Sequence, residues 1–132
     1  QQQELAGQIV AHWTDGYGGG VNPDRKQALS LMRICSTLDE VLQGVGEKWQ
    51  EKASIFATCA NPTHNTVGYE DVQSRLYGRE PMLLLFGTAG GLAPEVMAES
   101  DGTLPPIRGW GEFNHLSVRS AVSIILDRLL AR

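Results

Sequence analysis

Residues 104–132 read LPPIRGWGEFNHLSVRSAVSIILDRLLAR and divide into two parts of different character. Residues 104–113 hold two prolines, two glycines and a tryptophan, which predicts an irregular loop with a fixed path. From Asn114 the pattern predicts a helix, with Ser117 at its N-cap and apolar residues recurring at helical spacing as far as Leu130. A helix start offers free N–H groups and the positive end of the helix dipole. This stretch therefore predicts one wall of a binding site for a polar or anionic ligand.

A second wall is predicted upstream, where an apolar run ends in a glycine-rich turn. MLLLF at residues 82–86 lies between Pro81 and Gly87, which predicts a parallel strand buried on both faces. Three glycines within residues 87–91 let the backbone turn sharply and approach a ligand, and Pro94 suits the first turn of the next helix. Open α/β sheets bind ligands at the carboxyl ends of their strands, so we expect a site here. The spacing is neither a Walker A loop nor a complete GxGxxG.

The rest of the chain alternates predicted helices and strands, which is typical of a parallel α/β sheet. Helices are predicted at residues 2–13, at residues 69–76, and after a cap at Ser36 or Thr37, with Leu38, Val41, Leu42 and Val45 as the apolar stripe of that helix. Strands are predicted at residues 28–35 and 54–59, a flexible glycine-rich linker at residues 14–21, and a turn at residues 22–24.

Composition indicates one soluble domain. The 132 residues can bury a core, and neither a long apolar segment nor a signal peptide is present, so we expect a cytoplasmic protein without a membrane partner. Cys35 and Cys59 lack the spacing of a zinc site or a disulfide framework. We therefore expect no metal, and we predict that both cysteines are small core residues on strands.

The formal net charge of −4 counts against a nucleic-acid partner, although a local basic patch can bind RNA on an acidic protein. Solvated surface charge is the alternative interpretation for each basic candidate. These candidates are Arg25, Lys26, Arg33, Arg108, His115 and Arg119.

Two motifs together resemble one known family. GTAGGLAPEV at residues 87–96, followed by LPPIRGWGEFNHLSVRSAVSIILDRL at residues 104–129, resembles the paired C-terminal motifs of the SPOUT (α/β-knot) RNA methyltransferases. The closer likeness is to a small bacterial branch of enzymes that depend on S-adenosylmethionine. The resemblance is clear over residues 81–130 and looser over residues 22–35 and 53–60.

The resemblance implies an α/β fold with a mostly parallel sheet flanked by helices and a C-terminal deep trefoil knot, in which three loops hold the cofactor. It also implies that residues 1–132 form a single SPOUT-like domain. Because the chain opens on a helix where the family has a further strand and helix, we expect that this domain lacks its N-terminal strand and helix.

The resemblance further implies a set of residues that bind S-adenosylmethionine. For the glycines an ordinary tight turn is the alternative, and for Leu85 and Leu104 core packing can hold together with binding. The implied cofactor-binding residues are Leu85, Phe86, Gly87, Thr88, Gly90, Gly91, Leu104, Ile107, Arg108, Gly109, Asn114, His115, Leu116 and Ser117.

Three residues near the second motif are candidates for catalysis. Glu112 could act as a base or orient the substrate, with a solvated carboxylate as the alternative. His115 can titrate near neutrality, with a hydrogen bond to its own loop as the alternative. Arg108 could meet a phosphate or the cofactor carboxylate, with a surface ion pair as the alternative.

Two functions are consistent with these features. The first is an S-adenosylmethionine-dependent methyltransferase acting on tRNA or rRNA. The second is a non-catalytic knot domain that binds cofactor or RNA and serves as a dimerisation or fusion module. In either case the apolar residues of 117–130 cover more than one helix face, which predicts a homodimer through this helix unless an N-terminal segment covers it.

Overall fold

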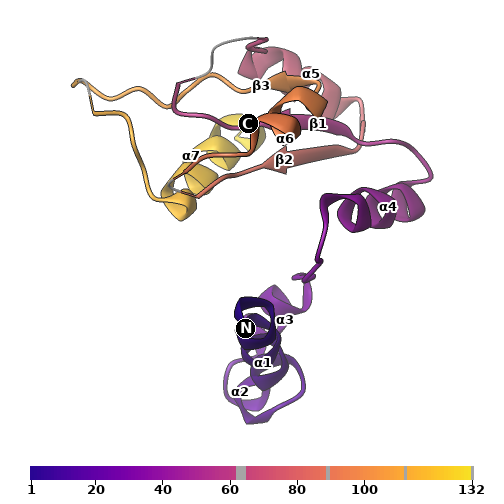
Figure 1. The fold of residues 1–132 in the computed structure, drawn as a ribbon. Helices are drawn as coiled ribbons and strands as arrows, with labels where there is room; N and C mark the ends of the chain where they lie inside the picture. The colour runs from indigo at the N-terminus through magenta and orange to yellow at the C-terminus, as the bar shows by residue number, and fades with distance from the viewer. Residues whose placement is uncertain (62–64, 89, 112, 132) are drawn as a thin grey trace. The chain divides into compact units, whose positions relative to one another are not determined.

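The chain forms two compact units, Gln1–Val41 and Leu42–Arg132 (Figure 1). The computed structural model describes residues 1–61, 65–88, 90–111 and 113–131. The second unit holds the three strands found in the described residues, and it therefore contains the sheet that the sequence predicts.

The first unit contains three short helices, α1 (Gln2–Thr14), α2 (Tyr17–Val21) and α3 (Pro23–Ser30). The prediction of α1 is confirmed, but the prediction of a flexible linker at residues 14–21 is wrong, because α2 lies there. Its glycines allow close packing, since a Cβ on Gly19 would lie 2.4 Å from the backbone oxygen of Trp13. Gly18 and Gly19 are both buried, so small size rather than flexibility explains the glycine run.

The predicted turn at residues 22–24 and strand at residues 28–35 are also wrong. Asn22 is the N-cap of α3, and its side-chain oxygen accepts a hydrogen bond of 2.9 Å from the amide of Arg25. Pro23 occupies the first turn, where its missing N–H costs nothing. This helix start signal explains why the segment after Asn22 is helical. The chain after Ser30 is irregular, so Cys35 does not lie on a strand.

Helix α4 (Leu38–Trp49) confirms the predicted apolar helix and its cap. The hydroxyl of Thr37 accepts a hydrogen bond of 3.2 Å from the amide of Glu40, whose carboxylate accepts one of 2.8 Å from the amide of Ser36. This arrangement is a variant of the capping box, in which Glu40 bonds the amide of the residue before Thr37, so one free amide at the helix start is satisfied by a side chain.

The second unit is built on a parallel three-stranded sheet of β1 (Ser54–Ala57), β2 (Met82–Leu85) and β3 (Gly102–Thr103). The strand order is β2-β1-β3, so the chain passes from one side of β1 to the other between β2 and β3. The connecting helices are α5 (Tyr69–Tyr77) and α6 (Pro94–Glu99), and α7 (Val118–Leu130) ends the chain. The predictions of a mixed α/β fold with a parallel sheet and of these helices are confirmed.

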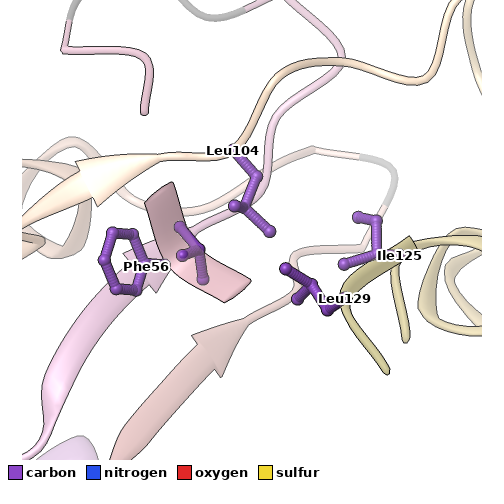
Figure 2. Packing of buried hydrophobic residues seen from close by; sticks show 5 residues of the cluster. Phe56, Leu104, Ile125 and Leu129 are labelled. Atoms are coloured by element: carbon purple, nitrogen blue, oxygen red, sulfur yellow. The ribbon is translucent and has the colours of Figure 1, made fainter. Parts of the chain in front are cut away.

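The core lies between the sheet and helices α5 and α7. Phe56 of β1, Leu104 after β3, and Ile125 and Leu129 of α7 converge there (Figure 2), together with Val72 of α5. All five side chains are buried, and burial of this apolar surface is the main term that stabilises the packing of α7 on the sheet.

Two details of the sheet differ from the prediction. Each residue of β2 is half-buried rather than buried, because β2 lies at one end of the three-stranded sheet in the described part of the chain. Strand β3 was not predicted, since it has two residues and one of them is glycine. Gly102 is needed because a Cβ there would lie 2.5 Å from Cγ2 of Val67.

Candidate functional site

A pocket of about 460 Å³ lies at the carboxyl ends of the three strands. Its walls are the segments that follow β1, β2 and β3, together with the segment that leads into α7. The strand order reverses around β1, and the carboxyl ends beside such a reversal are where open α/β sheets bind ligands. The lining residues are Thr58, Cys59, Ala60, Asn61, Phe86, Gly87, Thr88, Gly90, Gly91, Leu104, Pro105, Pro106, Ile107, Asn114, His115, Leu116, Ser117, Val118, Ala121 and Ile125.

The wall after β2 is a tight turn whose shape depends on glycine. The amide of Gly91 donates a hydrogen bond of 2.7 Å to the carbonyl of Thr88, and Gly91 has a φ of 78°. Gly87 lies against this turn, because a Cβ there would be 2.5 Å from the carbonyl carbon of Gly91 and 2.8 Å from the amide nitrogen of Leu92. The turn therefore presents backbone groups to the pocket at close range.

The first wall is tied to the end of β2. Thr58 donates two hydrogen bonds to the carbonyl of Leu85, one of 3.0 Å from its amide and one of 2.8 Å from its hydroxyl. The Leu85 carbonyl is thereby occupied within the protein, and Leu85 does not line the pocket. This pair of bonds holds the walls after β1 and β2 side by side.

The wall after β3 is held from two sides. The amide of Leu104 donates to the carbonyl of Ala57, with a distance of 2.9 Å, and this bond continues the sheet past β3. The hydroxyl of Tyr69 on α5 donates a hydrogen bond of 3.1 Å to the carbonyl of Pro105. The Arg128 guanidinium of α7 lies 5.3 Å from the Tyr69 ring centroid. Helices α5 and α7 thus fix the position of this wall.

The segment before α7 closes the pocket. The side-chain amide of Asn114 donates a hydrogen bond of 2.8 Å to the carbonyl of Ala60, so this segment is attached to the wall after β1. Ser117 is the N-cap of α7, as predicted, and its hydroxyl accepts a hydrogen bond from the amide of Ser120. The start of α7 therefore borders the pocket, since both Ser117 and Val118 line it.

Comparison with known proteins identifies the kind of chain that carries this pocket. Residues 1–131 match the family described as SAM-dependent RNA methyltransferase. The chain belongs to this family. It is 45% identical over 129 residues to a tRNA (guanine-N(1)-)-methyltransferase of Oleidesulfovibrio alaskensis. That match covers 98% of this chain and 30% of the relative.

Two further relatives are similar over nearly the whole chain. A tRNA (guanine-N(1)-)-methyltransferase of Nitratidesulfovibrio vulgaris is 37% identical over 129 residues, covering 98% of this chain and 30% of that protein. An uncharacterized protein of Aquifex aeolicus is 38% identical over 124 residues, covering 93% of this chain and 60% of that protein. The chain therefore spans less than two thirds of the length of each of these relatives.

A solved structure supports the fold. A probable methylase family protein of Haemophilus influenzae superposes with a TM-score of 0.58 at 18% sequence identity. The match covers 79% of this chain and 47% of that one. The α/β fold is therefore shared with a methylase family protein of low sequence identity.

For this member of the RNA methyltransferase family, the structure brings most of the predicted binding residues together. Leu85, Arg108 and Gly109 do not line the pocket, and binding of a cofactor by the others stays a prediction. The predicted residues that line the pocket are Phe86, Gly87, Thr88, Gly90, Gly91, Leu104, Ile107, Asn114, His115, Leu116 and Ser117.

The three catalytic candidates have different positions. His115 lines the pocket, and its ring lies 5.8 Å from the Phe113 ring, measured between centroids. Arg108 is exposed and outside the lining, and Glu112 lies outside the described residues. Among the described lining residues none is Asp, Glu, Lys or Arg, so His115 is the lining side chain with a ring nitrogen that could act as a general acid or base.

Sequence reasoning missed the wall after β1. Thr58, Cys59, Ala60 and Asn61 all line the pocket, and Cys59 is a half-buried free thiol beyond the strand rather than a core residue on it. The signal was present, because these residues follow a predicted parallel strand and the carboxyl ends of neighbouring strands meet at one edge.

The described residues hold neither a candidate metal cluster nor a membrane-crossing helix. They contain no cluster of three or more His, Cys, Asp or Glu side chains that could hold a metal ion. Over the same residues, no helix combines the length and the apolar character that crossing a bilayer requires.

Proposed function

We propose that the pocket binds S-adenosylmethionine and that the protein transfers its methyl group to RNA. One observation carries the proposal: the pocket occupies the carboxyl ends of the parallel strands in a chain that matches an RNA methyltransferase family over residues 1–131. Its volume of about 460 Å³ falls in the range of small-molecule sites, roughly 300–1,000 Å³. A tRNA or rRNA substrate and action in the cytoplasm are part of this proposal.

The lining is chemically suited to this cofactor. Phe86, Leu104 and Ile107 offer apolar surface to an adenine ring, and the turn at Gly87 and Gly91 offers backbone groups at close range. Hydroxyl and amide side chains add hydrogen-bonding groups for a ribose and an amino acid. When bound, the cofactor supplies a methyl group on a positively charged sulfur. The protein's part is to hold it in line with an RNA nitrogen or oxygen.

His115 is the residue that we assign to the methyl acceptor. It lines the pocket and is exposed, so its ring can contact a substrate that enters from solvent. A neutral imidazole there can accept the proton that the acceptor loses, or orient the acceptor by a hydrogen bond. We propose no direct role for Arg108, which lies outside the lining.

The test of function separates binding from transfer. Calorimetry with S-adenosylhomocysteine should show binding by the unmodified protein, and labelled S-adenosylmethionine should transfer methyl groups to bulk RNA. In the His115→Gln variant, transfer should fall by about 100-fold, the scale of general acid–base catalysis. Binding of S-adenosylhomocysteine should change little. An unmodified protein that fails to bind S-adenosylhomocysteine would rule out the proposal.

We further propose the SPOUT-type knot implied by the motifs. Its support is that the segment before α7 is bonded through Asn114 to the chain after β1, 54 residues away, while three separate loops surround one pocket. Experimental coordinates in which residues 117–132 do not pass through a preceding loop would contradict it.

We also propose a homodimer formed through α7. Ile125 and Leu129 are buried in the core, whereas Leu126 and Leu130 are 38% and 60% exposed and Ile124 is half-buried. The helix therefore carries apolar side chains beyond the face that packs on the sheet, which indicates a second partner surface. In a symmetric assembly that partner is the same helix of a second copy.

The dimer is tested by an outward charge on α7. Ile124→Asp should convert dimers to monomers at micromolar concentration, as measured by light scattering, because a buried carboxylate at an apolar interface is costly. Leu129→Asp is not a suitable variant, since Leu129 is 1% exposed and its replacement would unfold the core. Ser123→Asp, one residue away on an exposed position, is the matched control for charge. An unmodified protein that is already monomeric would contradict the proposal.

The second candidate function is a non-catalytic cofactor- or RNA-binding module. It is favoured by the relatives, in two of which this chain corresponds to 30% of a longer protein. It is also favoured by the lack of Asp and Glu among the described lining residues. A protein that binds S-adenosylhomocysteine but transfers no methyl group to bulk RNA would support this function over the first.

A further inference from the structure

The connection between β3 and α7 carries two large aromatic side chains that are exposed to solvent. Trp110 is fully exposed and Phe113 is 81% exposed, unlike the buried aromatic Phe56 of the core. Figure 1 shows this connection reaching away from the sheet before it returns to the start of α7. We call residues 108–111 and 113 the aromatic loop. Exposing two such rings costs stability, so a binding partner is the physical explanation to test.

The aromatic loop begins and ends at the pocket. The residue before it, Ile107, lines the pocket, and so does Asn114, the residue after it. The backbone at both ends is held, by the hydrogen bond of Tyr69 to Pro105 on one side and that of Asn114 to Ala60 on the other. Trp110 and Phe113 are therefore only a few residues along the chain from residues that line the pocket, so a ligand that contacts them lies beside the pocket.

The groups around the rings favour a nucleic acid over an apolar protein surface. The exposed guanidinium of Arg108 lies two residues from Trp110 in the sequence, and the exposed imidazole of His115 is tilted at 41° to the Phe113 ring. An aromatic ring combined with a cationic or imidazole group is the usual composition of a surface that stacks on bases. An apolar protein partner would leave these polar groups without hydration.

The overall charge indicates how such a contact would bind. Proteins that bind a long duplex usually have an excess of basic residues that contact its phosphates. This protein has a net charge of −4 and lacks that excess. Stacking on aromatic rings needs few charges, but it does need bases that are free of their partner strand. The net charge and the exposed rings therefore both favour RNA whose bases are unpaired.

We propose that Trp110 and Phe113 stack on unpaired bases of the RNA substrate, so that the pocket acts on a single-stranded or loop nucleotide. This inference rests on the proposed function and deepens it, since it names the class of RNA and the residues that hold it. The aromatic loop binds the bases beside the acceptor, and the pocket holds the cofactor.

The probes are a short unstructured single-stranded RNA with a fluorescent label and the same sequence as a duplex. The unmodified protein should bind the single strand more tightly. The dependence on salt should be shallow, because few phosphates are neutralised by this acidic protein. Trp110→Ala should raise the Kd for the single strand by about five- to 150-fold, the factor expected for losing one stacked base. Phe113→Ala should act in the same direction. Trp110→Phe should retain most of the affinity.

Trp49→Ala is the control, because Trp49 is a 53% exposed tryptophan of the second unit with a cation, Lys48 Nζ, 5.7 Å from its ring centroid. This control should leave the Kd unchanged. RNA should also quench tryptophan fluorescence in the unmodified protein by more than in Trp110→Phe. Equal affinity of Trp110→Ala and the unmodified protein, preference for the duplex, or no RNA binding at all would overturn the proposal.

Two further readouts separate this inference from its alternatives. Trp110→Ala should still bind S-adenosylhomocysteine, so loss of RNA affinity alone cannot arise from failure of the pocket. If the unmodified protein binds S-adenosylhomocysteine but RNA affinity survives the substitution, the aromatic-loop inference fails and the proposed function stands. A change in the mass measured by light scattering, without a change in RNA affinity, would show that the rings face a second copy and would also overturn it.

Discussion

Replacing Gly87 with alanine is expected to weaken binding of S-adenosylhomocysteine by about ten- to 100-fold, the scale of overpacking a close contact. The added Cβ would lie 2.5 Å from the carbonyl carbon of Gly91 and 2.8 Å from its oxygen. These neighbours are backbone atoms, which cannot move away as the end of a flexible side chain could. The turn must therefore shift, and with it the backbone groups that it presents to the pocket. Calorimetry measures the affinity directly.

Gly109→Ala is the control for this prediction, because it adds the same methyl group at a glycine outside the pocket lining. A Cβ on Gly109 has no atom within 4 Å. Affinity should therefore be close to that of the unmodified protein. Circular dichroism should show both variants folded, since neither glycine belongs to the core. Unchanged affinity in the Gly87 variant would show that this turn does not form the cofactor site.

Replacing Leu104 with alanine is expected to lower the free energy of unfolding of the second unit by about 2–5 kcal/mol, the cost of truncating a buried leucine. Leu104 is 1% exposed and packs with Phe56, Ile125 and Leu129 (Figure 2). It also lines the pocket, so the same truncation removes part of a pocket wall. Urea unfolding followed by circular dichroism measures the stability, and calorimetry measures the loss of S-adenosylhomocysteine affinity.

Tyr77→Ala gives the comparison, because Tyr77 is 63% exposed at the end of α5. Its truncation should change the free energy of unfolding by less than about 1 kcal/mol, since little buried surface is lost and alanine favours a helix. Similar urea midpoints for the two variants would contradict the core assigned to the second unit.

The second unit could be predicted from the sequence because its local signals agree with its packing. Ser117 as a cap, the apolar spacing after it, and the run at residues 82–86 each specify one structure. The degree of burial of β2 could not be predicted, because the apolar run does not show how many strands lie beside it. β3 was missed since two residues give no periodicity, and its glycine reflects contact with Val67 from a distant segment.

The first unit was predicted less well because glycine runs and an asparagine before proline each occur in more than one kind of local structure. A run such as GYGGG is typical of a linker, yet here Gly18 and Gly19 are buried against the end of α1. Asn22 followed by proline fits a turn or a helix cap, and the cap was formed. Nothing local to these residues distinguishes the two outcomes, since packing against Trp13 decides between them.

The parts of the candidate site that lie within the two quoted motifs were predicted from the sequence. Asn114 and Gly87 fall in the quoted motifs and line the pocket. The wall after β1 lies outside those motifs, and it becomes part of the pocket only when parallel pairing places its end beside β2. Residues that act by tertiary position, such as Tyr69 through its hydrogen bond to Pro105, carried no sequence signal at all.

The hydrogen bond from Asn114 to Ala60 has a consequence for the time course of folding. It closes a loop between residues 54 apart, and the pocket on either side of it also needs β1, β2 and β3 to be paired. Contacts of such long sequence separation form slowly, because loop-closure entropy is lost before they contribute. We therefore expect the site to become competent to bind late in refolding. A ligand that binds there is expected to stabilise the folded second unit, including the packing of α7 on the sheet, by mass action.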